Sequence, residues 1–359
     1  MFSRFASSRR SSTLLGTALV AGVAALPAVA DEYEQIFALS DINPSSPDAG
    51  IFGVASIGGN FVFTTAFGDA NENDIIQGPP FTTVIDNSGV LIANGNATGI
   101  AGGQFYANSA TTSVFVDTNS DSIFTLDVQN NTLVREKSNA EIIAFTGLTS
   151  SSQQIDQGVL DSDGNLLFYN GSSDSIISLS PGGTLSTFAS DSDLTSGIGT
   201  DIVRSMVSDT ANQILYIGST ATDEIYSLDY SGDTFVYSTV LANADLEAFT
   251  GSTTFGPNNL FFAPDGLVYF YDSSSDGIYS FDPGDALNSL TLVIDDDALI
   301  DGPGGTAVLG GLVWVDGEIG WWVSRTFNGS VAGVYAIPEP SSLALLGLGG
   351  LLVTRRRRG

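Results

Sequence analysis

The sequence contains no cysteine and no histidine. Without cysteine the chain cannot form disulfides, thiolate metal sites or thiol nucleophiles. Without histidine it lacks the commonest general base and the commonest zinc ligand, which excludes serine–histidine hydrolases. Any acid–base or metal chemistry of this chain therefore has to use carboxylates.

Basic residues are scarce outside the two ends of the chain. Of eleven lysines and arginines, seven lie in residues 1–30 and 338–359, whereas only one of forty acidic residues, Glu339, lies there. Residues 31–337 therefore carry a formal charge of 4 − 39 = −35. Such a surface stays soluble, attracts cations and repels nucleic acid and anionic lipid, so we expect no nucleic-acid partner.

The first thirty residues have the order of parts of a secretory signal peptide. Three arginines precede an apolar core, and Ala28 and Ala30 form an A-x-A signal for cleavage before Asp31. The adjacent Arg9 and Arg10 leave a twin-arginine route open as an alternative. The residues that follow them are not bulky and apolar, which favours the general secretory route.

The last twenty-two residues, 338–359, form a second signal. The apolar run Leu343–Val353 has eleven residues and would span about half of a ~30 Å hydrocarbon core as a helix, so it is a marginal anchor that contacts the inner membrane transiently. Basic residues beside an apolar segment stay in the cytoplasm, which places residues 31–337 outside. The polar parts of this signal are Pro338, Glu339, Pro340, Arg355, Arg356, Arg357 and Arg358.

This Pro-Glu-Pro, apolar run and arginine cluster resembles the PEP-CTERM sorting domain of exported bacterial proteins. The resemblance implies recognition by an exosortase-type membrane enzyme and removal of the tail. It also implies release to the cell surface or extracellular polymer of a Gram-negative bacterium. An ordinary tail anchor is the alternative.

The body of the chain is internally repetitive. Four hairpin-like segments align, each with an apolar strand, a polar turn and a second strand, at 113–127, 166–180, 214–229 and 268–282. Their apolar residues occupy both faces of the strands, as in a sheet that is covered on both sides. A second marker recurs at a constant interval of 52 residues, at Glu141, Asp193, Asp245 and Asp297.

A repeat of about 50 residues with four short strands and no amphipathic helix is the size of one propeller blade. The 307 residues of the body hold about six such units, which predicts an all-β propeller of about six four-stranded blades. The segment 35–40 looks like a stray second hairpin strand, and we expect it to pair with the last blade and remove exposed edges. A two-sheet sandwich or an open β-solenoid is the alternative.

Segments 161–169 and 263–271, leading into the repeated turn, are similar to blades of the NHL and YWTD group of propellers. The resemblance implies the fold but not an activity, because that architecture hosts hydrolases, lactonases, receptors and scaffolds. The basic residue that those repeats often place in the hairpin turn is missing here.

The acids Glu141, Asp193, Asp245 and Asp297 are the candidate metal ligands. If the connections between blades converge at one mouth of the channel, these carboxylates could hold Ca²⁺, which prefers oxygen ligands. The alternative is that each acid caps a short helical turn. No cofactor is otherwise required.

The turns and tryptophans are further candidates. The turn aspartates are loosely similar to the Asp-box of sialidase-type propellers, but we interpret them as Asx-turns that close hairpins; they are Asp121, Asp174, Asp223 and Asp276. Trp314, Trp321 and Trp322 could offer a sugar-stacking surface. Because Trp321 and Trp322 are adjacent in a strand, they face opposite sides and at least one should lie in the core.

The sequence thus predicts a signal peptide (1–30), a propeller (31–337) and a sorting signal (338–359). The favoured function is a non-catalytic binding or structural module associated with surface polysaccharide. A calcium-dependent hydrolase or lactonase with carboxylates in its channel is the competing hypothesis.

Overall fold

The structure is a computed structural model, and several segments of the chain are described. These segments are 34–42, 50–57, 60–66, 74–86, 105–107, 111–117, 120–148, 155–200, 202–251, 256–272, 275, 277–295, 309–315, 317–323 and 333–336. The predicted signal peptide and sorting tail lie outside these residues, as do Asp276 and Asp297. The boundaries predicted at 30/31 and 337/338 therefore stay predictions.

The described strands form six antiparallel sheets of four strands each. Each of the first five sheets uses four consecutive strands, in the order in which they occur in the chain. The first three are β2 (Gly50–Ile57), β3 (Asn60–Ala66), β4 (Asp74–Gly78) and β5 (Thr82–Asp86); β6 (Phe105–Ala107), β7 (Thr112–Asp117), β8 (Ser122–Asp127) and β9 (Thr132–Lys137); and β10 (Ile155–Leu160), β11 (Leu166–Asn170), β12 (Ser175–Leu179) and β13 (Leu185–Ala189). The next two are β14 (Ser205–Asp209), β15 (Ile214–Ser219), β16 (Glu224–Asp229) and β17 (Val236–Leu241); and β18 (Pro257–Phe262), β19 (Val268–Asp272), β20 (Gly277–Phe281) and β21 (Thr291–Ile294).

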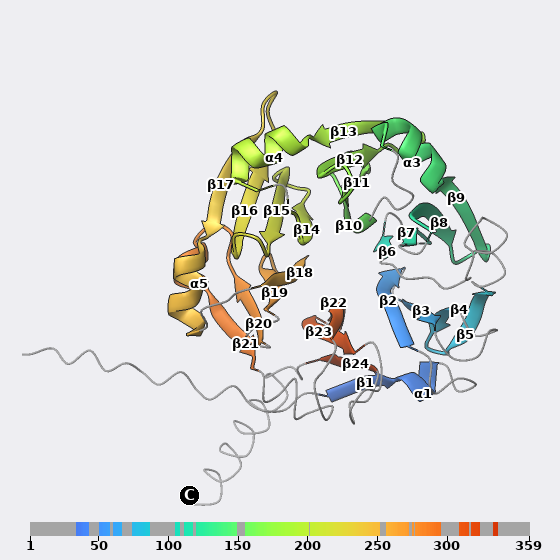
Figure 1. The fold of residues 1–359 in the computed structure, drawn as a ribbon. Coiled ribbons are helices and arrows are strands. Elements are labelled where there is room, and N and C mark those ends of the chain that lie inside the picture. The colour runs from blue at the N-terminus through green and yellow to red at the C-terminus, as the bar shows by residue number, and fades with distance from the viewer. Residues whose placement is uncertain are drawn as a thin grey trace, which may run out of the picture. The chain divides into compact units, whose positions relative to one another are not determined.

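These sheets are the blades of a closed propeller (Figure 1). The first strand of each blade is innermost, and each innermost strand contacts the innermost strand of the next blade in sequence. The contacts return from β22 (Leu309–Val315) to β2, which closes the ring. The prediction of six four-stranded blades is confirmed, and neither a sandwich nor an open solenoid fits this arrangement.

The sixth blade is built from both ends of the body. Its strands run β22, β23 (Glu318–Val323), β24 (Gly333–Ala336) and β1 (Glu34–Ala38) from the centre outward. The N-terminal strand β1 pairs antiparallel with β24, and Gln35 Nε2 donates a hydrogen bond to Tyr335 Oη at 3.2 Å. The predicted pairing of segment 35–40 with the last blade is thus confirmed, and it covers an edge that would otherwise be exposed.

The hydrophobic core is divided among the six interfaces between blades. Each interface holds one cluster of buried side chains. Adjacent residues of the middle strands enter different clusters because successive side chains of a strand point to opposite faces. Phe115 of β7, for example, packs toward the first blade and Val116 toward the third. This explains why the middle strands are apolar on both faces.

Three helices of eight residues join consecutive blades along the outside of the ring (Figure 1), namely α3 (Asn139–Thr146), α4 (Asp191–Ile198) and α5 (Asn243–Thr250). They are short helical turns of the kind that the alternative interpretation of Glu141, Asp193 and Asp245 predicts. Each buries one apolar side chain beside its first turn, Ile142, Leu194 or Leu246. Two single turns, α1 (Leu39–Ile42) and α6 (Ala286–Ser289), complete the helices of the described chain. No helix within the described segments is long and apolar enough to cross a membrane.

The alternating strand directions give the ring two distinct faces. One, called here the connection face, carries the links between blades and the hairpins that join the second and third strands. The other, called the hairpin face, carries the hairpins that join the first to the second strand and the third to the fourth. In the sixth blade, β24 runs toward the hairpin face and β1 starts from it.

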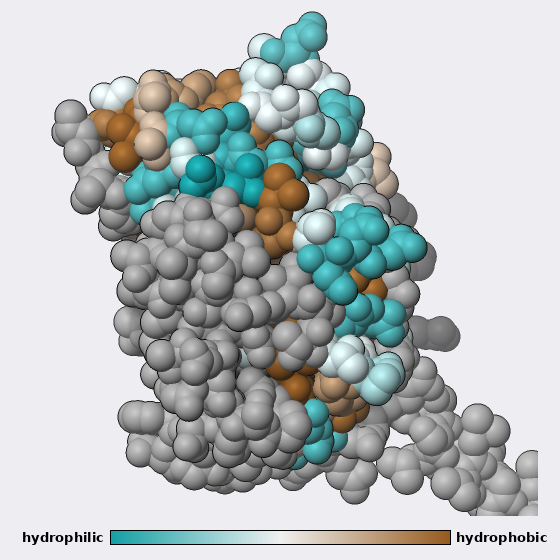
Figure 2. All heavy atoms as spheres, turned by 90° about the vertical axis from the view of Figure 1, so that its right-hand side faces the viewer, coloured by the Kyte–Doolittle hydropathy of each residue, from teal (hydrophilic) through white to brown (hydrophobic). Residues whose placement is uncertain are grey.

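Figure 2 shows the ring from the side on which α3 and β9 lie in Figure 1. The described surface there is mixed, with hydrophilic areas and smaller hydrophobic ones. The exposed apolar side chains that these two elements contribute are Phe145 of α3 and Val134 of β9. Single exposed apolar residues of this kind are normal on a soluble domain.

Candidate functional site

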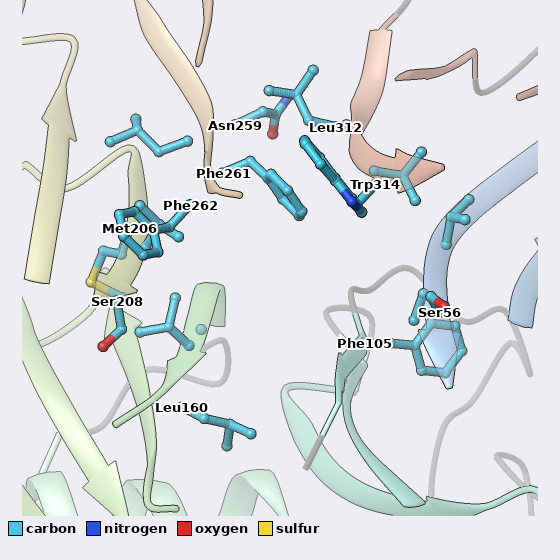
Figure 3. A pocket seen from close by; sticks show the side chains of 18 of the residues that line it. Ser56, Phe105, Leu160, Met206, Ser208, Asn259, Phe261, Phe262, Leu312 and Trp314 are labelled. Atoms are coloured by element: carbon cyan, nitrogen blue, oxygen red, sulfur yellow. The ribbon is translucent and has the colours of Figure 1, made fainter. Parts of the chain in front are cut away.

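A cavity of about 450 Å³ lies in the central channel, lined by residues from the innermost strand of every blade. Figure 3 shows the labelled side chains arranged around its open centre. The lining is mainly apolar and aromatic, with Phe105, Leu160, Met206, Phe261 and Trp314 among its members. A mostly apolar concave site with few polar groups is the usual form of a ligand pocket.

Three polar side chains line the same cavity: Ser56, Ser208 and Asn259. Asn259 occupies the left-handed region, with φ of 50°, at a β-bulge of β18 that lies between Asn258 and Phe261. A bulge re-aims side chains locally, which accounts for the Asn259 amide lying in the channel lining. The neighbouring Asn258 is held in place, because its Oδ1 accepts a hydrogen bond of 2.9 Å from Arg204 Nε.

The innermost strands add backbone groups to this polar set. Each of them has only one hydrogen-bonded neighbour in its sheet, so its other edge faces the channel. Such an edge presents N–H donors and C=O acceptors. Within the described part of the chain, no acidic or basic side chain lines the cavity. The described groups that can form hydrogen bonds in the cavity are therefore all uncharged.

The three tryptophans have different environments. Trp321 and Trp322 are both buried, on opposite faces of β23 and in different core clusters. The Trp321 ring stacks on Tyr335 with ring centroids 5.7 Å apart. The prediction that at least one of this pair lies in the core is confirmed, and in fact both do. Trp314 and Trp322 both belong to the cavity lining, and Trp314, which is only half-buried, is the more accessible of the two to a ligand.

The three predicted metal ligands in the described segments lie on three separate helices. Glu141, Asp193 and Asp245 lie in the first turns of α3, α4 and α5, each in the link after a different blade. Across the described segments, no group of three or more acidic residues is placed to hold a metal ion. The calcium site stays a prediction.

Two of these acids act as helix caps instead. Glu141 accepts hydrogen bonds from the backbone N–H and the hydroxyl of Ser138, while Asp193 does the same with Ser190. These hydrogen bonds hold the pKa of each carboxyl below its usual value. The bond from the Ser138 backbone contributes most for Glu141, and the bond from the Ser190 hydroxyl contributes most for Asp193. Ala242 precedes α5 and offers no side-chain cap, so Asp245 has no such partner at that position.

The three turn aspartates in the described segments share one backbone conformation. Asp121, Asp174 and Asp223 take left-handed backbone conformations, with φ of 47°, 48° and 56°, which aspartate tolerates better than most residues. Buried residues four positions earlier, at the strand ends, act as Asx-type acceptors. Asn170 Oδ1, for example, accepts from the backbone N–H of Ser172 and Ser173. The equivalent acceptors are Asp117, Ser219 and Asp272.

A second cavity, of about 490 Å³, lies beside α4 and β17. Tyr237 lines it, and burial, aided by the charge of Asp193, raises the pKa of this phenol to about 12. Gly197 of α4 is required there, because an added Cβ would lie 2.4 Å from the Tyr237 ring. This cavity comes from local packing between α4, the hairpin before β17 and the start of β17.

Comparison with known proteins identifies the tail. The family model described as the PEP-CTERM protein-sorting motif matches residues 336–358. No curated protein matches the chain at a significant level.

Solved structures share the fold of the body. A luciferin-regenerating enzyme matches with a TM-score of 0.54 at 11% identity, over 85% of this chain and 94% of that one. A Staphylococcus aureus virginiamycin B lyase matches with 0.51 at 12%, over 86% and 90%. A Bacteroides thetaiotaomicron protein of unknown function matches with 0.53 at 12%, over 85% and 72%. At these identities the likeness shows the fold alone.

The body is a six-bladed β-propeller. The chain carries a PEP-CTERM sorting motif at its C-terminus, which indicates export and sorting at the membrane and implies recognition by an exosortase.

Proposed function

We propose that this exported protein is a non-catalytic binding module of the cell surface or extracellular matrix, and that its channel binds a neutral stretch of surface polysaccharide. The observation that carries the proposal is the aromatic and uncharged lining of the cavity. Sugar rings have an apolar C–H face that packs on aromatic side chains, and Trp314 and Phe261 offer such rings.

Sugars also present hydroxyl groups that need both donors and acceptors. The hydroxyls of Ser56 and Ser208, the amide of Asn259 and the backbone edges of the innermost strands supply both kinds. An anionic polymer has no cationic partner among the described lining residues. A neutral segment therefore fits the chemistry of the cavity better than an acidic one.

The lining also supports a role without catalysis. Glycoside hydrolysis requires a pair of carboxyl groups beside the scissile bond, and calcium-dependent hydrolysis requires several oxygen ligands at one point. The competing hydrolase or lactonase hypothesis needs these carboxylates in the channel. Among the described residues, the acids lie in turns, helix caps and strand ends, and none lines the cavity.

The test is a binding titration of residues 31–337, which contain every strand of the six sheets, with neutral glucan and galactan oligosaccharides. We expect saturable binding that Trp314→Ala weakens about tenfold, since losing one stacked ring costs on the order of 1–2 kcal/mol. Phe249→Ala, which removes an exposed aromatic from α5, is the matched control and should leave the affinity unchanged.

Two results would contradict the proposal. One is release of new reducing ends from the oligosaccharides, which would make the protein an enzyme. The other is failure of all the neutral oligomers to bind, or binding that is indifferent to Trp314→Ala.

A further inference from the structure

The sorting tail leaves the propeller from the hairpin face. β24 is the third strand of the sixth blade, so it runs from the connection face to the hairpin face and ends there at Ala336. The sorting motif begins at this residue. β1 starts on the same face, because it pairs antiparallel with β24. The start of β1 and the end of β24 therefore lie on one face of the ring.

The tether between the body and the apolar segment is short. Only six residues, 337–342, separate the end of β24 from Leu343. Fully extended, six residues reach about 20 Å. While the tail is in the membrane, the body therefore stays within about this distance of the lipid surface.

The hairpin face is acidic and has no compensating cation in the described hairpins. Nine carboxylates lie in these hairpins or at the strand ends beside them: Asp127, Asp161, Asp163, Asp209, Asp229, Asp233, Asp265, Asp282 and Asp285. No lysine or arginine occurs in the same segments.

The described basic residues offer this face no free cation. Lys137 lies beside the hairpin 180–184, since a Cβ added at Gly183 would be 3.9 Å from its Nζ, but its charge is paired with Glu141 at 3.4 Å. Arg204 directly precedes β14 on the connection face. Arg135 lies two residues before Lys137 in the same strand. Arg325 falls between β23 and β24 in the sequence, outside the described residues.

We propose that the tail-anchored protein turns its hairpin face toward the membrane and that the uncompensated charge of this face keeps the body off anionic lipid. The inference concerns the anchored state and is independent of the ligand in the channel. Screening at physiological ionic strength limits the repulsion to about 8 Å, which the tether can span. The carboxylates of this face repel anionic lipid head groups.

This orientation has a consequence for the channel. The connection face points away from the lipid. Most residues that line the cavity lie in the second halves of the innermost strands, toward the hairpin face, so the cavity is nearer to the membrane while the chain is anchored. Once the tail is removed, the hairpin face has no attraction that would retain the body at the membrane.

The absence of cysteine allows a direct test with single spin labels. Thr210 and Thr220 are exposed residues in hairpins at opposite ends of β15, on the hairpin and connection faces respectively. β15 has six residues, so the two positions lie about 20 Å apart along the direction of this strand. The variants Thr210→Cys and Thr220→Cys are thus matched in residue type, blade and exposure.

Each labelled chain of residues 31–359 is reconstituted through its tail into vesicles of phosphatidylethanolamine and phosphatidylglycerol that carry a nickel chelate on lipid head groups. We expect nickel to enhance relaxation several times more at position 210 than at 220. Equal enhancement, as for a ring standing on its rim, or stronger enhancement at 220 would overturn the orientation.

The role of charge is tested by lipid composition and salt. Replacing phosphatidylglycerol with phosphatidylcholine, or raising the ionic strength, should increase the enhancement at position 210, because the repulsion is removed or screened. No change under either condition would overturn the repulsive role of the hairpin face. Labelled residues 31–337, which lack the tail, should show no enhancement at either position, and adsorption of this body to the anionic vesicles would refute the proposal.

Discussion

The contribution of β1 to stability can be tested at Phe37. This half-buried ring packs against Phe61, Phe63 and Phe81 of the first blade, with ring centroids 5.3, 6.2 and 5.1 Å away. It therefore joins the last blade to the first. Replacing a fully buried phenylalanine with alanine costs about 3–5 kcal/mol. Because Phe37 is only half-buried but makes three ring contacts, we expect Phe37→Ala to lower the free energy of unfolding by about 2–3 kcal/mol.

The assay is urea unfolding of residues 31–337 followed by tryptophan fluorescence and by circular dichroism. Trp322 shares the core cluster against which Phe37 packs, so fluorescence reports on the closing blade. Phe249→Ala is the control, because Phe249 is 46% exposed and makes one described ring contact, with Tyr279. The control should cost less than about 1 kcal/mol. Equal losses for the two variants would refute the conclusion that β1 secures the ring.

Three more predictions concern caps, turns and calcium. Ala242→Ser supplies the missing N-cap of α5 beside Asp245 and should raise the free energy of unfolding by about 1 kcal/mol, whereas Ser190→Ala should lower it by about as much, both measured by urea unfolding. Turn hydrogen bonds lower the pKa of Asp127 and Asp229, so their stabilisation is complete above the unfolded pKa near 4 and is lost as pH falls through the lower folded pKa. Thermal unfolding should therefore show a loss below about pH 4 that Asp-to-Asn changes at both positions reduce. Because the described candidate metal ligands lie on separate helices, calcium and magnesium should raise the melting temperature slightly and equally, and a saturable rise with calcium alone would contradict this.

The sequence was sufficient to predict the blades because each blade repeats the same requirement. A middle strand lies between two neighbouring blades, so it must be apolar on both faces and must end in a tight turn. The 52-residue interval of Glu141, Asp193 and Asp245 reports this repetition, and their helices follow the outermost strands of three successive blades. The details of the turns were not predictable in the same way. The sequence repeat singled out Asp174, which takes a left-handed conformation, but it did not indicate that Asn170 accepts backbone hydrogen bonds in the same turn.

The candidate site could not be found from the sequence for a related reason. Its lining comes from six strands that are spread from β2 to β22, and no motif is common to Phe105, Leu160 and Trp314. The bulge that places Asn259 in the lining follows from the register of one strand pair. The sequence singled out Trp314 as an aromatic residue, but only the fold distinguishes its half-buried position from the buried positions of Trp321 and Trp322.

The mixed origin of the sixth blade also sets the order of events during biosynthesis. Gln35 and Tyr335 are 300 positions apart, so their contact needs the longest loop closure in the described ring. During export, β1 crosses the membrane early and remains without its partner until β24 follows. The sorting motif follows β24 directly in the chain. Completion of the ring and arrival of the sorting signal therefore coincide, and a chain truncated before residue 333 would expose unpaired strand edges and carry no tail to be sorted.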